Sequence, residues 1–204
     1  MTMIETTQTG DMAWVTINRP DKANALTEEM LQQIAEAVEA STAKVLVLTG
    51  QGKVFSAGAD LDAARAGLAT SPVWERLSGS IAAFPGLTIA ALNGTVAGGA
   101  CGMVLACDLR IAAEGAKLFY PVMKLGFLPQ PSDPARLTAL VGPAKAKLIL
   151  MAGAKLTTNE AQSCGVFDRV VAPDALHETV ETLAADCLSA DMSHVTAIKQ
   201  MIHV

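Results

Sequence analysis

A short and almost wholly apolar run at residues 44–49 constrains the fold of this chain more than any other feature. Such a run is typical of a parallel strand whose two faces are both covered by helices. The segment before it predicts a helix, because Thr27 can cap its first turn and Ile34 and Val38 share one apolar face. A buried strand that follows an amphipathic helix indicates an α/β fold with helical crossovers.

The order of strand, loop and helix recurs along the chain. Further strands are predicted at residues 12–17, 88–92, 109–113 and 166–171, and helices near residues 61–83 and 98–106, from Pro143, from Thr157, from Pro173 and at 193–203. Thr157 and Glu160 have the spacing of a capping box. Since no linker rich in Pro, Gly or Ser interrupts the pattern, a single domain is predicted.

Composition and charge exclude several classes of protein. With 204 residues, of which 51% are hydrophobic, the chain can fill a core. Its net charge is −5, and it lacks the cluster of basic residues typical of proteins that bind nucleic acids. The cysteines form no CxxC pair and have no nearby histidine at ligand spacing, so we expect buried reduced thiols and no metal site. These thiols are Cys101, Cys107, Cys164 and Cys187.

One uncharged segment, residues 88–107, has the length of a membrane span, about twenty residues. Asn93 and Gly94 divide it into a strand and a helix, and Asp108 follows at once, so we expect no membrane helix. The first residues include Glu5 and lack a basic region followed by an apolar core, which argues against a signal peptide. A cytoplasmic location is therefore expected.

Two loops rich in small residues, 55–61 and 93–101, place the backbone where it can approach a ligand. A glycine turn at the start of a helix exposes unpaired N–H groups and the positive end of the helix dipole. Neither loop has the spacing of a nucleotide-phosphate motif. The alternative use is an oxyanion hole, in which each backbone donor stabilises a developing oxyanion by about 3 kcal/mol. Each loop by itself is also explained by tight turns.

The two loops belong to a series of motifs that resembles the crotonase superfamily, also called the enoyl-CoA hydratase/isomerase family. In chain order the motifs are Asn18-Arg19-Pro20, Ala23-Asn24-Ala25-Leu26, Val47-Leu48-Thr49-Gly50, Phe55-Ser56-Ala57-Gly58-Ala59-Asp60-Leu61, Asn93-Gly94, Gly98-Gly99 and Ala106-Cys107-Asp108. The resemblance implies one crotonase-like (ClpP/crotonase) α/β domain over residues 1–204. A spiral of strand-strand-helix turns would occupy residues 1–170 and a truncated helical part residues 171–204, without the terminal helices common in the family.

The same resemblance implies the ligand and the residues that hold it. The substrate would be an acyl-CoA, with coenzyme A as part of the substrate and no covalently bound cofactor, and its thioester oxygen would accept hydrogen bonds from the backbone of Ala59 and Gly99. The implied substrate-binding residues are Lys22, Ala23, Ala25, Ala57, Ala59, Asp60, Leu61, Asp62, Gly98, Gly99, Val122 and Gln130. The assembly implied is a homo-oligomer, a trimer or a hexamer.

The chain departs from hydratases of this family at both catalytic glutamates. The first would stand where the sequence has Gly102, and the second, after Pro121, where it has Val122. An acidic residue that isomerases place after the Gly-x-x-Pro motif is replaced by Gln130. General acid–base catalysis typically contributes about 10²- to 10⁴-fold per group, so ordinary hydration should be slow.

Other side chains could supply the missing chemistry. Tyr120 and Asp133 are the candidates we name, although Asp133 also has the sequence context of an N-cap and Lys124 that of a surface cation. Cys101 lies beside the glycine run. The histidines are His177, His194 and His203, all in the C-terminal part, which gives no support to a serine or cysteine nucleophile paired with histidine.

Three functions remain open on the sequence. The first is an enzyme that acts through a thioester enolate in isomerisation, decarboxylation, C–C cleavage or a specialised hydration. The second is a non-catalytic acyl-CoA binder or assembly partner. The third is an ordinary hydratase in which another acid, such as Glu75 or Asp62, reaches the pocket.

Overall fold

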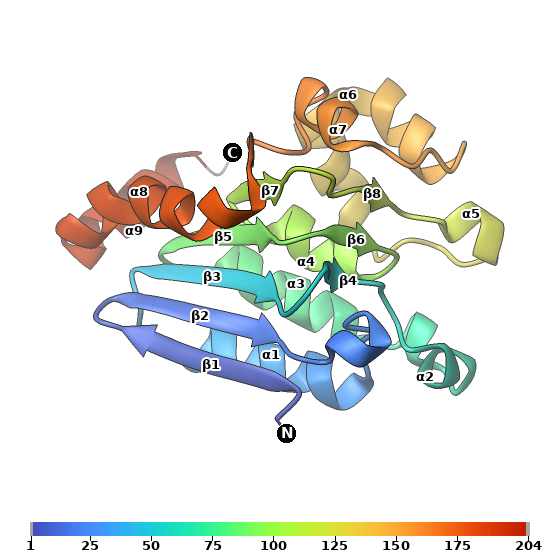
Figure 1. The fold of residues 1–204 in the computed structure, drawn as a ribbon, viewed down its shortest axis with the longest axis horizontal. Coiled ribbons are helices and arrows are strands. Elements are labelled where there is room, and N and C mark those ends of the chain that lie inside the picture. The colour runs from blue at the N-terminus through green and yellow to red at the C-terminus, as the bar shows by residue number, and fades with distance from the viewer. Residues whose placement is uncertain (1, 203–204) are drawn as a thin grey trace.

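The computed structural model describes residues 2–202 and contains a six-stranded sheet flanked by helices (Figure 1). The strand order is β1-β2-β3-β5-β7-β9, and every neighbouring pair is parallel except the hairpin of β1 with β2. The strands are β1 (Ile4–Thr9), β2 (Met12–Ile17), β3 (Val45–Gly50), β5 (Leu87–Leu92), β7 (Leu109–Ala113) and β9 (Arg169–Val171). The α/β class expected from the sequence is confirmed.

At β3 both faces of this sheet are buried, which explains the unbroken apolar run at residues 44–49. In β3, Leu46 and Leu48 join the core beneath α1 (Glu28–Ala40) and α3 (Val73–Ala83). Val45 and Val47 join a second core with Val180 of α8 (Leu176–Ser189). Alternate side chains of one strand thus serve two cores.

A second, smaller sheet builds the turns of the spiral. It consists of β4 (Val54–Ser56), β6 (Thr95–Ala97) and β8 (Leu118–Phe119), paired in parallel in that order. Each of these strands follows a strand of the large sheet and precedes a helical segment, so the chain winds through three strand-strand-helix turns. This is the crotonase-like spiral expected from the resemblance, and its small sheet is where the glycine loops begin.

The remaining helices follow the strands of the small sheet or belong to the C-terminal part. They are α2 (Leu61–Arg65), α4 (Ala100–Ala106), α5 (Val122–Leu125), α6 (Asp133–Leu150), α7 (Thr158–Ser163) and α9 (Met192–Ile202), with short 3₁₀ turns η1 (Pro20–Lys22), η2 (Leu68–Thr70) and η3 (Pro173–Ala175). Thr27 accepts the N–H of Met30 as the cap of α1, and Thr157 and Glu160 form the expected capping box.

The structure corrects several sequence-based boundaries. The helical region expected at residues 61–83 is divided into α2, η2 and α3, because Gly67 has φ +111° and Pro72 follows shortly after. The helix expected from Pro143 is found as the second half of α6, because Gly142, with φ +74° and ψ +165°, breaks α6 into two helical segments just before Pro143. Of the strand expected at residues 166–171, only β9 is a strand, because the N–H groups of Val166 and Phe167 both donate to the carbonyl of Ala161 in α7 instead of to a neighbouring strand. The helix expected at residues 193–203 is α9, and His203 lies outside the described residues.

Within residues 2–202, no helix has the length and apolar character needed to cross a bilayer. The uncharged segment at residues 88–107 is divided among β5, β6 and α4, as expected.

Candidate functional site

The two glycine loops touch each other at the ends of β4 and β6. A Cβ added to Gly58, which has φ +91°, would lie 2.7 Å from the carbonyl oxygen of Ala97 and 3.4 Å from the Cα of Gly98. Gly98 also has a positive φ, +56°. Because β4 and β6 are adjacent parallel strands, their carboxyl ends deliver the two loops to one place. Glycine is required at residue 58 for this close approach.

Asn24 fixes the start of the first loop. Its side chain is fully buried, and its Nδ2 donates to the carbonyl oxygens of Gln51, at 3.0 Å, and Val54, at 2.7 Å. Its Oδ1 accepts the N–H of Arg19 at 2.8 Å, and its own carbonyl accepts the Ser56 hydroxyl at 2.8 Å. Asn24 has φ +54°, a conformation that asparagine tolerates better than most residues. One buried amide therefore joins η1, β4 and the glycine loop.

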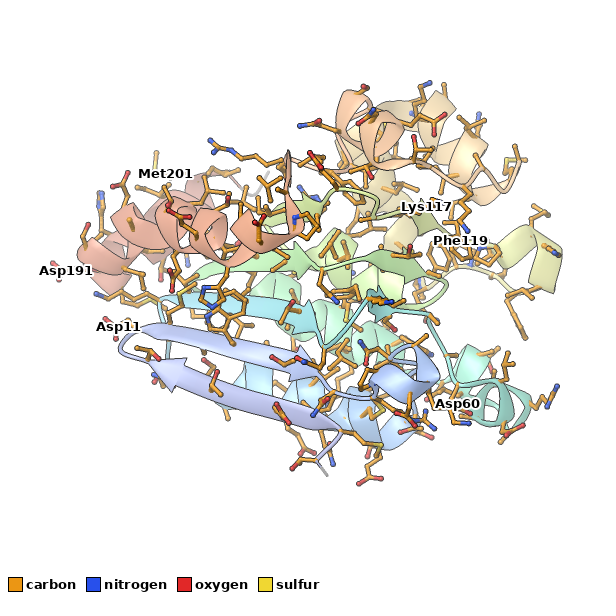
Figure 2. All side chains as sticks on the ribbon, viewed as in Figure 1. Asp11, Asp60, Lys117, Phe119, Asp191 and Met201 are labelled. Atoms are coloured by element: carbon orange, nitrogen blue, oxygen red, sulfur yellow. The ribbon has the colours of Figure 1, made fainter. Side chains whose placement is uncertain are left out.

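Asp60 closes the same loop at its other end. Its Oδ2 forms a 2.8 Å ion pair with Arg19, and its Oδ1 accepts the N–H groups of Asp62 and Ala63 as the cap of α2. The Arg19 hydrogen bond, supported by the Ala63 N–H, lowers the pKa of Asp60 below its ordinary value. Asp60 and Phe119, labelled in Figure 2, stand on the side of the molecule towards which the parallel strands β2, β3 and β5 run.

The backbone amides of Ala59 and Gly99 donate no hydrogen bond within the part of the chain that the structure describes. The amide before each of them is occupied, since the N–H of Gly58 is bonded to Ser56 and that of Gly98 to Phe119. Both free amides belong to residues that line one cavity. A buried or semi-buried N–H without a partner is unusual and calls for a ligand or a solvent molecule.

The backbone at Gly99 rests on an aromatic ring. A Cβ at this position would lie 3.0 Å from Cη2 of Trp74, a side chain that is only 4% exposed. The Trp74 indole N–H donates to the carbonyl of Leu68 at 2.8 Å, which fixes the ring. A side chain at residue 99 would therefore press on the ring of Trp74, and the sequence offers no signal for the role of Trp74 in α3.

The cavity at these loops has a volume of about 310 Å³. Its lining includes eight residues expected from the sequence, namely Ala57, Ala59, Leu61, Gly98, Gly99, Tyr120, Val122 and Gln130. The other lining residues are Ala64, Arg65, Ala69, Trp74, Ala97, Phe119, Pro121, Leu125, Phe127 and Leu128. The expected residues Lys22, Ala23, Ala25, Asp60, Asp62 and Asp133 do not line it.

A larger cavity of about 560 Å³ lies between α8, α9 and the first residues of β5 and β7, and its lining includes Leu87, Cys187 and Ile198. We place the functional site at the smaller cavity because both glycine loops meet there and because its lining includes Ala59 and Gly99, whose amides are unpaired. Size alone does not identify a binding site, whereas convergent polar groups do.

Tyr120 connects this cavity to a buried carboxyl group. Its hydroxyl donates to Oδ2 of Asp133 at 2.8 Å and accepts the N–H of Gln130 at 3.4 Å. Burial raises the pKa of Asp133 to about 6, although the Tyr120 hydrogen bond and the charge of Arg136 act in the opposite direction. Burial, followed by the neighbouring Asp133, raises the pKa of Tyr120 above its ordinary value.

The interpretation of Asp133 as an N-cap is wrong. The capping position of α6 belongs to Ser132, which makes no side-chain cap bond, and Asp133 is the first residue of the helix. Its carboxylate is fully buried and turned towards Tyr120 rather than the helix start. A tertiary hydrogen-bond partner has overridden the local preference of aspartate for caps.

The other polar side chains considered are exposed, paired with other residues or, in the case of Cys101, kept protonated. Lys124 is exposed on α5, and Asp62 is exposed and paired with Arg65 at 3.0 Å. Glu75 accepts hydrogen bonds from the hydroxyl and the N–H of Ser132. Burial, followed by Asp133, raises the pKa of the Cys101 thiol well above its ordinary value, so this thiol stays protonated and is a poor nucleophile.

Neither described histidine lines the cavity: the ring of His177 stacks on Trp14 at 4.4 Å, and His194 is exposed on α9. Within residues 2–202, no group of three His, Cys, Asp or Glu side chains is arranged to hold a metal ion.

Comparison with known proteins gives one consistent result. The family model for enoyl-CoA hydratase/isomerase matches residues 7–204. YngF of Bacillus subtilis, which carries the enoyl-CoA hydratase/isomerase name, is 41% identical over 185 residues that cover 85% of this chain and 71% of that protein. The crotonyl-CoA hydratase of Syntrophomonas wolfei is 35% identical over 188 residues, covering 87% and 72%. A crystal structure of enoyl-CoA hydratase from Bacillus anthracis superposes with a TM-score of 0.89 at 30% identity, covering 98% and 82%.

Proposed function

Because the chain belongs to the enoyl-CoA hydratase/isomerase family, we propose that it is an acyl-CoA enzyme whose backbone amides at Ala59 and Gly99 stabilise a thioester enolate. The observation that carries the proposal is that these two amides have no partner among the described residues and belong to the lining of one cavity. Two donors directed at one carbonyl oxygen would lower the barrier to enolate formation by about 3 kcal/mol each.

The coenzyme A part of the substrate would follow the loop from η1 to Asp62. Lys22, Ala23 and Ala25 stand outside the cavity itself, but the N–H of Ala57 bonds to the carbonyl of Ala23 at 3.0 Å. That bond joins the η1 turn to the rim of the cavity. A long ligand that enters the cavity from this side would therefore pass both segments.

The reaction we propose is an isomerisation, a decarboxylation or another lyase reaction through the enolate. Ordinary hydration needs one group to activate water and another to protonate the α-carbon, and neither Gly102 nor the buried Val122 can do so. Hydration is the second candidate. It is favoured by the names of relatives such as the crotonyl-CoA hydratase of Syntrophomonas wolfei and by the presence of a carboxyl group, that of Asp133, next to Gly102.

The test is turnover of a panel of acyl-CoA thioesters, followed by mass spectrometry, in two variants at one position. Gly99→Pro removes the N–H donor, whereas Gly99→Ala keeps it and adds the same Cβ against Trp74. We expect Gly99→Pro to lose about 10²- to 10³-fold more activity than Gly99→Ala. Equal activities in two folded variants would refute the oxyanion role, and binding of thioesters without any turnover by the unmodified protein would establish a binder instead.

The assembly and the location stay predictions. We infer a homo-oligomer, a trimer or a hexamer, which light scattering coupled to size exclusion would measure, and a cytoplasmic location.

A further inference from the structure

The space beside Gly102 is filled by a carboxyl group from another part of the chain. A Cβ built on Gly102 would lie 2.9 Å from Oδ2 and 3.0 Å from Oδ1 of Asp133. Gly102 is the position at which the family resemblance expects the first hydratase glutamate. A carboxylate is therefore present beside that position, but it is supplied by the first residue of α6 instead of by α4.

This carboxylate is not fully satisfied inside the protein. Oδ2 is bonded to Tyr120, but Oδ1 has no hydrogen-bond partner among the described residues, and neither does Nη1 of Arg136, which lies 3.9 Å from it. A buried oxygen of a charged group that has no hydrogen-bond partner is destabilising, and native proteins contain few such groups. Such unfavourable carboxyl groups are concentrated at functional sites.

Tyr120 is the link between this carboxyl group and the ligand. It lines the cavity with Gly99, whereas Asp133 lies behind it and outside the lining. Given the function proposed above, we propose that Tyr120 exchanges a proton with the α-carbon of the bound thioester and that Asp133 holds the exchanged proton through the Tyr120 hydroxyl.

In this step one proton moves from the substrate to Asp133 by way of Tyr120. The Tyr120 oxygen takes a proton from the α-carbon while its own proton passes to Oδ2 of Asp133, along the 2.8 Å hydrogen bond. The electron pair of the broken C–H bond moves into the thioester, and its oxygen becomes the anion that the amides of Ala59 and Gly99 face. Return of the proton from Asp133 through Tyr120 to carbon completes a reprotonation.

The charged and titratable groups around Asp133 agree with this role. Tyr120 and Cys101 remain protonated because their pKa values are raised, Arg136 lies on the same helix, and the charge of Glu75 on α3 raises the pKa of Asp133. With burial as the main cause, the pKa of Asp133 stands at about 6. A carboxyl group that titrates near neutrality can both accept and return a proton under physiological conditions.

The test is exchange of the α-protons of butyryl-CoA with D₂O, followed by mass spectrometry, because exchange reports proton transfer whatever the final reaction is. The Tyr120 hydroxyl swaps its proton with water in the cavity, which carries the label to carbon. We expect Asp133→Asn and Tyr120→Phe each to slow exchange by about 10²-fold or more. In the unmodified protein the exchange rate should rise with pH to a plateau above pH 6, and Asp133→Asn should abolish this rise.

Binding of butyryl-CoA, measured by calorimetry on each folded variant, separates the two proposals. Asp108→Asn is the control, because Asp108 is a partly buried aspartate that bonds to Thr88 and Lys199 and does not line this cavity. Slow exchange in both test variants with unchanged binding and a normal control supports the relay. Undiminished exchange in either folded test variant overturns the relay and leaves the binding proposal intact. Binding of butyryl-CoA by the unmodified protein without any exchange has the same meaning. Failure of the unmodified protein to bind overturns both proposals.

Discussion

Alanine at residue 102 would bring its Cβ to within 2.9 Å of the Asp133 carboxylate, so these two residues depend on each other. We expect Gly102→Ala to lower the free energy of unfolding by about 1–3 kcal/mol, the usual cost of overpacking a core. With Asp133→Ala already in place the carboxylate is gone, and the same change should cost much less. Urea unfolding of the four members of this double-mutant cycle measures the coupling, and additive effects would contradict the proposed contact.

The Asp133 carboxyl group should also give stability a particular pH dependence. Its pKa is about 6 in the folded protein, against 3.8 as the ordinary value. Between pH 4 and 6 the folded state therefore binds more protons than the unfolded state, and the free energy of unfolding falls as the pH rises through this window. The shift corresponds to about 3 kcal/mol.

Asp133→Asn removes this titration, so its free energy of unfolding should rise relative to that of the unmodified protein by up to about 3 kcal/mol between pH 4 and 6 and stay parallel above pH 7. Denaturant unfolding at several pH values checks the difference. A difference that does not change with pH would show that Asp133 titrates at its ordinary pKa.

At the scale of elements, the geometry of the site depends on how closely the loop after β4 approaches the end of β6. Gly58 and Gly115 offer a matched pair, since their φ values are +91° and +84° but only Gly58 has backbone within 3 Å of an added Cβ. We expect Gly115→Ala to cost about 1 kcal/mol, the conformational part alone. Gly58→Ala should cost at least 2 kcal/mol more, because the Ala97 carbonyl must move.

Thermal unfolding and thioester turnover of both variants check this prediction. Turnover should fall only in Gly58→Ala, because Gly115 does not line the cavity. Equal losses of stability would mean that the two loops are free to separate.

The long buried strands and capped helices were predictable from the sequence, and the short elements were not. Apolar runs and caps identified β2, β3 and α1 because periodicity needs several residues to be visible. The strands of the small sheet have only two or three residues each, and β1 exposes all its side chains after Ile4. Their presence is decided by pairing with distant segments rather than by local pattern.

The candidate site was also predictable only where a local sequence motif marks it. Motifs identified Ala59, Gly99 and Tyr120 as neighbours of one ligand, and these residues do line one cavity. The sequence indicated that a carboxylate is missing at Gly102. It did not indicate that Asp133, which comes 31 residues later (133 − 102), fills the space beside Gly102. Only the fold brings α4 and α6 together, and a cap was the natural local interpretation of Asp133.

At the scale of the molecule, a buried arginine joins the spiral core to the C-terminal part. Arg110 of β7 is 3% exposed and donates to the carbonyls of Val166, at 2.8 Å, and Cys107, at 2.7 Å. Its guanidinium pairs with Asp168 at 2.8 Å, just before β9. Removal of one partner of a buried ion pair leaves an uncompensated charge, which typically costs 3–5 kcal/mol.

Because the Asp168 side chain is 33% exposed, water can partly replace it. We therefore expect Asp168→Ala to lower the free energy of unfolding by less than a fully buried pair would, about 2–3 kcal/mol in urea, and Asp168→Asn to cost less because its amide oxygen can still accept from Arg110. A loss below about 1 kcal/mol in Asp168→Ala would mean that water replaces the carboxylate at Arg110. The control is Asp62→Ala, which breaks an exposed pair and should change stability little.

The ring of Trp74 lies against Gly99 and lines the cavity, so its fluorescence can serve as a probe of ligand binding. The chain has two tryptophans, and the other, Trp14, lies on the large sheet against His177. In a Trp14→Phe background, the wavelength of maximum fluorescence emission of Trp74 would report the polarity and hydration of the turn at Gly99. The rate of thioester binding could then be measured by stopped-flow fluorescence, without a label and without knowledge of the product.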